Sequence, residues 1–271
     1  MENQEVELED PAARRAEPPP AAEAPSHLLT CFPEGAVSES KHGCLFACHV
    51  RLPDIYRGAA LLTKQYLSAF RAAAGLAGRG DLPRHLEPLA EADPAAAALI
   101  DAETAGFHGR PLFMLGLARF HKGHLTISQY FARDYAEEPA VLGMLAELLP
   151  ELRLLVSFNG KAFDWPFVRD RMAYHRIPCP PLVAHLDLLH PSRRRWRAHL
   201  PNCKLETLER YLSGRWRRGD IAGADIPQRY HDYVRWQDAR LIAPIFHHNR
   251  MDLITMIELL VALVSQPAAG A

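Results

Sequence analysis

From about residue 95 to residue 264, short apolar runs alternate with segments predicted to be helical. The runs with the length and composition of buried strands cover residues 98–100, 112–118, 125–131, 154–156 and 183–188. The predicted helices cover residues 138–149, 167–174 and 244–264. Because strands that alternate with helices form a sheet covered by helices, this part of the chain is predicted to be an α/β domain.

The first 94 residues show a weaker pattern. Residues 1–35 are rich in Ala, Pro and Glu, a composition that buries too little apolar surface to offset the entropy of ordering the chain. We therefore expect a disordered tail over residues 1–35. Residues 36–94 are interpreted as an N-terminal extension packing on the core, with a strand over residues 44–51 and a helix over residues 59–76. The α/β domain itself is expected to cover residues 95–266.

Charge and cysteine content leave several function classes open. The formal net charge of the 271 residues is −1, which does not mark a nucleic-acid-binding protein, although a local basic groove is sufficient for binding. The five cysteines are an odd number and are interpreted as reduced thiols. The apolar stretch over residues 253–264 is too short to cross a bilayer, and the N-terminus lacks an apolar signal region. We expect a cytoplasmic protein without a membrane partner.

Two acidic residues follow the first apolar run. Asp101 and Glu103 are alternate residues of a predicted strand, so their side chains point to the same face. Two carboxylates this close raise each other's pKa unless a cation lies between them. Mg²⁺ or Mn²⁺ would resolve that conflict, since both ions prefer oxygen ligands. The alternative is a solvated turn with two acids, and the pair alone favours that alternative.

Two further segments carry residues suited to the same chemistry. Asp164 lies at the start of a predicted helix, after a buried strand and the turn signal Asn159-Gly160, where helix capping is the alternative role. His248 and Asp252 lie four residues apart on the last predicted helix and so share one face. One of these two side chains can bind a metal ion while the other acts on a water molecule.

Together, these segments resemble a known family. The motifs are Asp101-x-Glu103-Thr104-x-Gly106, Asn159-Gly160-x-x-Phe163-Asp164-x-Pro166-Phe167 and His248-Asn249-x-x-Asp252. In this order they are similar to the three exonuclease motifs of the DEDD superfamily. With further matches at residues 185–191, 203–209 and 226–230, the chain resembles the YprB-type ribonuclease H-like proteins over residues 43–264. The resemblance implies an α/β ribonuclease H-like fold with a mixed central sheet flanked by helices.

The resemblance also implies an activity. The implied metal ligands are Asp101, Glu103, Asp164 and Asp252, which would hold two divalent ions, Mg²⁺ or Mn²⁺. The implied reaction is 3′→5′ exonuclease hydrolysis of phosphodiester bonds in single-stranded DNA or RNA by a two-metal mechanism. Family members carry a Tyr four positions or a His five positions before the last acid. This chain has His at both positions, His248 and His247, and His248 is the expected residue acting on the attacking water.

Other functions and roles stay open at this stage. The alternative functions are a catalytically weak or inactive nucleic-acid-binding protein and a hydrolase of small phosphate esters. The candidate substrate contacts are Thr104, Asn159, Lys161 and Phe163, although core packing is favoured over base stacking for Phe163. Residues 193–197 and 215–218 are basic runs that each contain a Trp, and they are interpreted either as nucleic-acid contacts or as solvated helix faces. Asp187 is expected to have a structural role.

Overall fold

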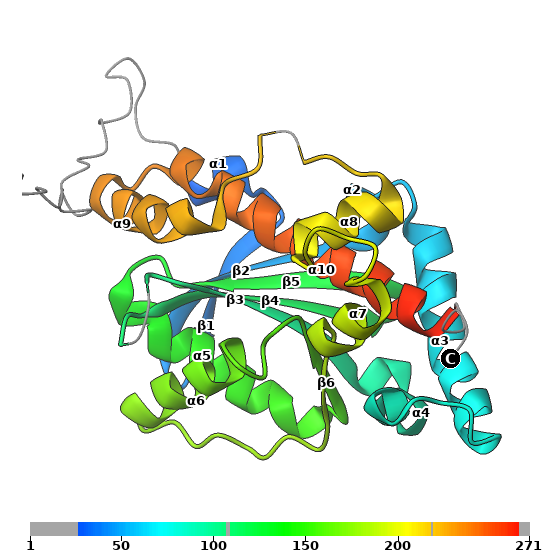
Figure 1. The fold of residues 1–271 in the computed structure, drawn as a ribbon. Coiled ribbons are helices and arrows are strands. Elements are labelled where there is room, and N and C mark those ends of the chain that lie inside the picture. Colours follow the sequence, from blue (N-terminus) through cyan, green and yellow to red (C-terminus); the bar gives the residue numbers. More distant parts are fainter. Residues whose placement is uncertain (1–26, 107–108, 218, 266–271) are drawn as a thin grey trace, which may run out of the picture.

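A seven-stranded mixed sheet organises the chain in the computed structural model, which describes residues 27–106, 109–217 and 219–265 (Figure 1). The strands are β1 (Gly35–Ser40), β2 (Gly43–Arg51), β3 (Ala97–Thr104), β4 (Leu112–His121), β5 (His124–Phe131), β6 (Leu154–Ser157) and β7 (His185–Asp187). Their order across the sheet is β1-β2-β5-β4-β3-β6-β7. β3 pairs antiparallel with β4 and parallel with β6, which in turn pairs parallel with β7. The sheet confirms the expected α/β fold with a mixed sheet.

Helices cover both faces of this sheet. They are α1 (Leu28–Cys31), α2 (Leu52–Ile55), α3 (Ala59–Gly78), α4 (Glu87–Glu91), α5 (Glu138–Leu148), α6 (Asp164–Tyr174), α7 (Leu189–Trp196), α8 (Leu205–Ser213), α9 (Ile226–Trp236) and α10 (Ala243–Ser265). Figure 1 shows α5 and α6 below the sheet and α8, α9 and α10 above it. β3 is consequently buried on both faces, with Ala98 and Ile100 in one apolar cluster and Leu99 in the other. None of the helices in the described part of the chain is long and apolar enough to span a membrane.

The N-terminal segment joins the same sheet. β2 pairs antiparallel with β5, and β1 forms the edge next to β2. The predicted tail lies mostly at residues 1–26, outside the described residues, but its last part is ordered as α1 and the start of β1. That part is held because the ring of Phe32 stacks on Phe246 at 4.1 Å between ring centres. β1 has no clear sequence signal, since its side chains are mostly exposed and Val37 faces solvent.

Candidate active site

The first acidic pair lies on β3, directly below α10. Asp101 pairs with Gly116 of β4 across the ladder, and Glu103 lies two residues further along the same face. The side chain of Asn249 on α10 reaches down to this strand, where Nδ2 donates a hydrogen bond to Asp101 Oδ2 at 2.8 Å. Asn249 Oδ1 accepts a hydrogen bond from Gln129 Nε2 at 3.0 Å. The buried amide of Asn249 therefore fixes the orientation of the Asp101 carboxylate.

Gly116 allows α10 to come this close to the sheet. A Cβ atom at Gly116 would lie 2.1 Å from Asn249 Oδ1, far inside van der Waals contact. We expect Gly116→Ala to destabilise the protein by about 1–3 kcal/mol through overpacking, and to displace Asn249 from Asp101. Thermal unfolding measures this loss. Gly75→Ala on α3 is the control, because its Cβ meets only the far end of Arg79 at 3.8 Å. If both variants unfolded at the wild-type temperature, the close approach of Asn249 to Gly116 would be contradicted.

The third acid follows β6 through a tight turn. Asn159 has a φ of 65°, and the carboxylate of Asp187 accepts hydrogen bonds from the backbone N–H groups of Asn159 (2.8 Å) and Lys161 (3.1 Å). The chain then enters α6 at Asp164. The cap position of α6 is Phe163, so the capping role considered for Asp164 is wrong. Burial raises the pKa of Asp164 to about 7.

α10 supplies the remaining acid and a histidine. His248 Nε2 lies 3.4 Å from Asp252 Oδ2, as expected for residues four apart on a helix. His248 is buried, whereas His247 is exposed on the same helix. His248 Nδ1 lies 3.1 Å from both carboxylate oxygens of Asp220. Asp220 therefore holds the imidazole ring from one side, so that the other ring nitrogen faces Asp252.

Arg217 inserts a positive charge into this acidic cluster. Its side chain is only 6% exposed, and Nη1 lies 2.6 Å from Asp252 Oδ1 and 3.2 Å from Asp220 Oδ2. Nε donates to Glu209 Oε2 at 2.5 Å. A single guanidinium thus connects α8, the segment after it and α10. Arg217 belongs to the basic run over residues 215–218, but its pairing with Asp252 was not expected, and Asp220 lies in none of the sequence motifs.

The four acids share one electrostatic environment. Burial raises the pKa of Asp101, and the negative charges of Asp252 and Asp164 raise it further. Burial also raises the pKa of Glu103, with added contributions from Asp101, Asp252 and Asp164. For Asp252, burial outweighs the opposing charges of His248 and Arg217, so its pKa is raised as well. Charges from segments that are distant in sequence therefore act together on Asp101 and Glu103.

The chemistry of these side chains, but not their present arrangement, suits a divalent cation. Carboxylate oxygens that repel each other in a buried site are stabilised by a hard cation such as Mg²⁺ or Mn²⁺. Asp252 Oδ1 is buried and accepts no hydrogen bond within the described residues, although it is paired with the guanidinium of Arg217. In the present arrangement of residues 27–106, 109–217 and 219–265, no three His, Cys, Asp or Glu side chains lie close enough to enclose an ion.

The candidate substrate contacts are distributed around the acids. Thr104 ends β3, and its hydroxyl donates a hydrogen bond to the carbonyl of Gly106 at 2.9 Å. Asn159 and Lys161 lie in the turn before Asp164, where the side chain of Lys161 is exposed. Phe163 is 65% exposed, so core packing is the wrong alternative for this ring.

Comparisons with known proteins decide the family. A model of the RNase H superfamily matches residues 98–264, which include all four acids and His248. The chain belongs to this superfamily. It is 34% identical over 165 residues to the uncharacterized protein YprB of Bacillus subtilis (strain 168), a match that covers 59% of this chain and 40% of YprB. The chain thus spans less than half of the length of that relative.

A solved structure is also similar to part of this chain. It is the family B DNA polymerase from the hyperthermophilic archaeon Pyrobaculum calidifontis, with 16% sequence identity and a TM-score of 0.49. The match covers 62% of this chain and 24% of the polymerase. The RNase H superfamily match and the mixed seven-stranded sheet together establish the RNase H-like nuclease fold for the chain.

Proposed function

We propose that this chain is a metal-dependent 3′→5′ exonuclease that hydrolyses phosphodiester bonds of single-stranded nucleic acid. The proposal is supported by the electrostatic coupling of four carboxyl groups: the charges of Asp164 and Asp252 act on both Asp101 and Glu103. Hydrolysis of a phosphodiester is slow mainly because of its negative charge. A site that concentrates cations around the phosphate is therefore the physical requirement for catalysis.

Divalent ions held by these four carboxylates would supply a Lewis acid for the phosphate oxygens and lower the pKa of water. The side chains of the protein would orient the metal ligands and accept the proton of the water. Asn249 holds the carboxylate of Asp101 in one orientation. The carboxylate of Asp220 accepts a hydrogen bond from Nδ1–H of His248, and Nε2, on the side of Asp252, would take the proton of the attacking water.

The role of His248 gives a prediction with a matched control. We expect His248→Ala to lower kcat by about 10²–10⁴-fold, because the group that accepts the proton of the attacking water is lost. Asp220→Asn should lower kcat by about 10–100-fold, because it only misorients His248. Neither variant should change KM substantially. His247→Ala, on the neighbouring exposed position, should keep the wild-type kcat in a steady-state assay. Equal activity of His248→Ala and His247→Ala would refute the assignment.

The proposed reaction is tested with oligonucleotides labelled at the 5′ end. Single-stranded DNA and RNA are incubated with the full chain and Mg²⁺, Mn²⁺ or a chelator. The proposal predicts products shortened stepwise from the 3′ end with metal and none with chelator. Binding without cleavage would instead support an inactive nucleic-acid-binding protein. Hydrolysis of a nitrophenyl phosphodiester without oligonucleotide cleavage would support a small-ester hydrolase, and either result would contradict the exonuclease.

A further inference from the structure

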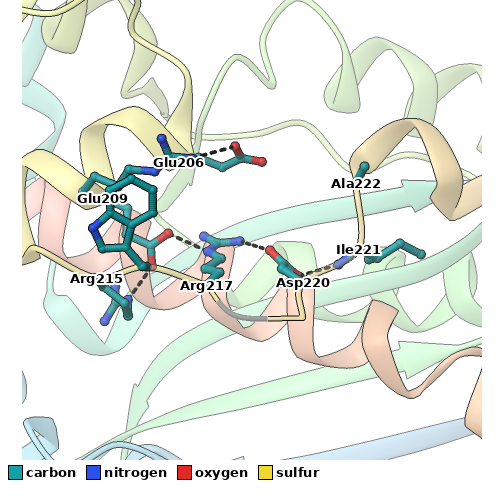
Figure 2. Close-up of a pocket in the computed structure, with 9 residues that line it drawn as sticks. Glu206, Glu209, Arg215, Arg217, Asp220, Ile221 and Ala222 are labelled. Atoms are coloured by element: carbon teal, nitrogen blue, oxygen red, sulfur yellow. Dashed lines mark hydrogen bonds and ion pairs between the residues drawn. The ribbon is translucent and has the colours of Figure 1, made fainter.

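A pocket lies beside the acidic site, between α8 and the segment that follows it (Figure 2). Its interior measures about 220 Å³, and its walls include Glu209, Arg210, Arg215, Trp216, Arg217 and Asp220. Figure 2 shows Arg217 between Glu209 and Asp220, with its guanidinium connected to both carboxylates. None of the four candidate metal ligands lines this pocket, whereas Arg215, Trp216 and Arg217 belong to the basic run over residues 215–218.

The pocket is directly connected to the acids through two of its wall residues. Arg217 lines the pocket and pairs with Asp252 at 2.6 Å. Asp220 lines the pocket and holds His248 at 3.1 Å. A nucleotide chain whose scissile phosphate reached the acids would therefore have a neighbouring nucleotide within reach of the pocket.

Trp216 gives the pocket an exposed aromatic surface. Its side chain is 71% exposed, which is unusual for so large an aromatic ring. The guanidinium of Arg210 lies 4.5 Å from the centre of the ring. A cation over one face of the indole holds the ring in place and leaves the other surface to a ligand. The Trp of the other basic run, Trp196, is buried in the core and offers no such surface.

The charges around Trp216 are compatible with an anionic ligand. Both carboxylate oxygens of Glu209 are paired, one with Arg215 and the other with Arg217. Asp220 is paired with Arg217 and His248. The third acid of the pocket wall, Glu206, lies 3.9 Å from Arg210, so each acid of the wall has an arginine or histidine partner. What remains for a ligand is an aromatic ring with an arginine beside it, the combination that binds single-stranded nucleic acid by stacking.

We propose that Trp216, supported by Arg210, is a stacking site for a nucleobase of the single-stranded substrate, next to the nucleotide that is cleaved. This inference rests on the proposed exonuclease function and names how its substrate is held. Stacking on an aromatic ring tolerates any base, because every base has a π face. The site therefore binds single strands without sequence preference, and a base inside a duplex is excluded because its faces are already stacked.

The test distinguishes binding through the bases from binding through the phosphate backbone. Binding of a labelled oligothymidylate is measured by fluorescence anisotropy with the full chain in a chelator, at one fixed salt concentration. A second oligonucleotide of the same length lacks the bases of its last three 3′ nucleotides. We expect the wild type to bind the complete oligonucleotide about 5–100-fold more tightly than the abasic one. Trp216→Ala should reduce this preference to within about twofold, and Trp216→Phe should retain most of it.

Trp236→Ala is the matched control. The guanidinium of Arg235 lies 4.8 Å from the centre of the Trp236 ring, but Trp236 is on α9 and does not line the pocket. It should keep the wild-type preference. Trp216 is exposed, so its variants should unfold at the wild-type temperature. If all variants bound tightly and Trp216→Ala still preferred the complete oligonucleotide over the abasic one as strongly as the wild type, the stacking site would be overturned. The proposed exonuclease function would not be affected by that result. Failure of the wild type to bind either oligonucleotide would overturn the proposed function and the stacking site with it.

Discussion

Asp101→Asn should lower the rate of metal-dependent phosphodiester hydrolysis by about a thousandfold or more while the protein stays folded. The carboxyl of Asp101 is affected by the charges of Asp252 and Asp164 and is oriented by a hydrogen bond from Asn249. An amide in its place is the same size but cannot neutralise a divalent ion, and ion-derived charge stabilisation accounts for several kcal/mol of the barrier. A steady-state oligonucleotide assay with Mn²⁺ measures the loss.

The same substitution should stabilise the metal-free protein. Because burial and the neighbouring carboxylates raise the pKa of Asp101 in the folded state, this carboxyl opposes folding above the ordinary carboxyl pKa, and the cost grows as the pH rises towards the folded pKa. Asn carries no charge, so the metal-free variant should unfold at a higher temperature than the wild type. Asp170→Asn, an exposed carboxyl on α6, is the control and should change neither activity nor unfolding. Full hydrolysis by Asp101→Asn would refute the assignment.

Arg217→Gln should increase the affinity for Mn²⁺ by about tenfold. Arg217 already neutralises Asp252 at 2.6 Å, so an ion that binds Asp252 has to displace this guanidinium. Removing the competing charge-assisted contact, worth about 1.5–3 kcal/mol, makes Asp252 available to the ion. The metal-free variant should also lose about 3–5 kcal/mol of stability, because Glu209, Asp220 and Asp252 each lose the buried guanidinium of Arg217. Calorimetric titration and thermal unfolding measure the two effects.

Arg171→Gln is the matched control for this prediction. Arg171 forms a comparably buried ion pair with Glu138, between α6 and α5. Its loss should destabilise the protein to a similar degree but leave the affinity for Mn²⁺ unchanged. If Arg217→Gln bound Mn²⁺ no better than the wild type, competition between the guanidinium and the ion would be excluded. Mn²⁺ should also raise the unfolding temperature of Arg217→Gln more than that of the wild type.

Local sequence patterns predicted much of this fold, because buried strands and long helices carry their own periodic signal. The apolar runs at 98–100 and 154–156 are confirmed as parts of β3 and β6, and the helix over 244–264 is confirmed as α10. The position of His248 beside Asp252 also follows from helical spacing alone. The edge strand β1 was missed because an exposed strand has no apolar alternation.

The parts of the site that sequence analysis missed depend on tertiary packing. Nothing near Gly116 in the sequence shows that Asn249 of α10 will lie over it. The two basic runs look alike in sequence, yet the packing buries Trp196 and exposes Trp216. Arg217 and Asp220 acquire their contacts to Asp252 and His248 only when the segment after α8 folds over α10.

A crystal of the full chain grown with saturating Mn²⁺ tests the central claim most directly, because anomalous scattering locates the ions. The account predicts two manganese peaks about 4 Å apart among Asp101, Glu103, Asp164 and Asp252, with the guanidinium of Arg217 moved away from Asp252. Manganese bound elsewhere only, with Arg217 still paired to Asp252, would contradict it.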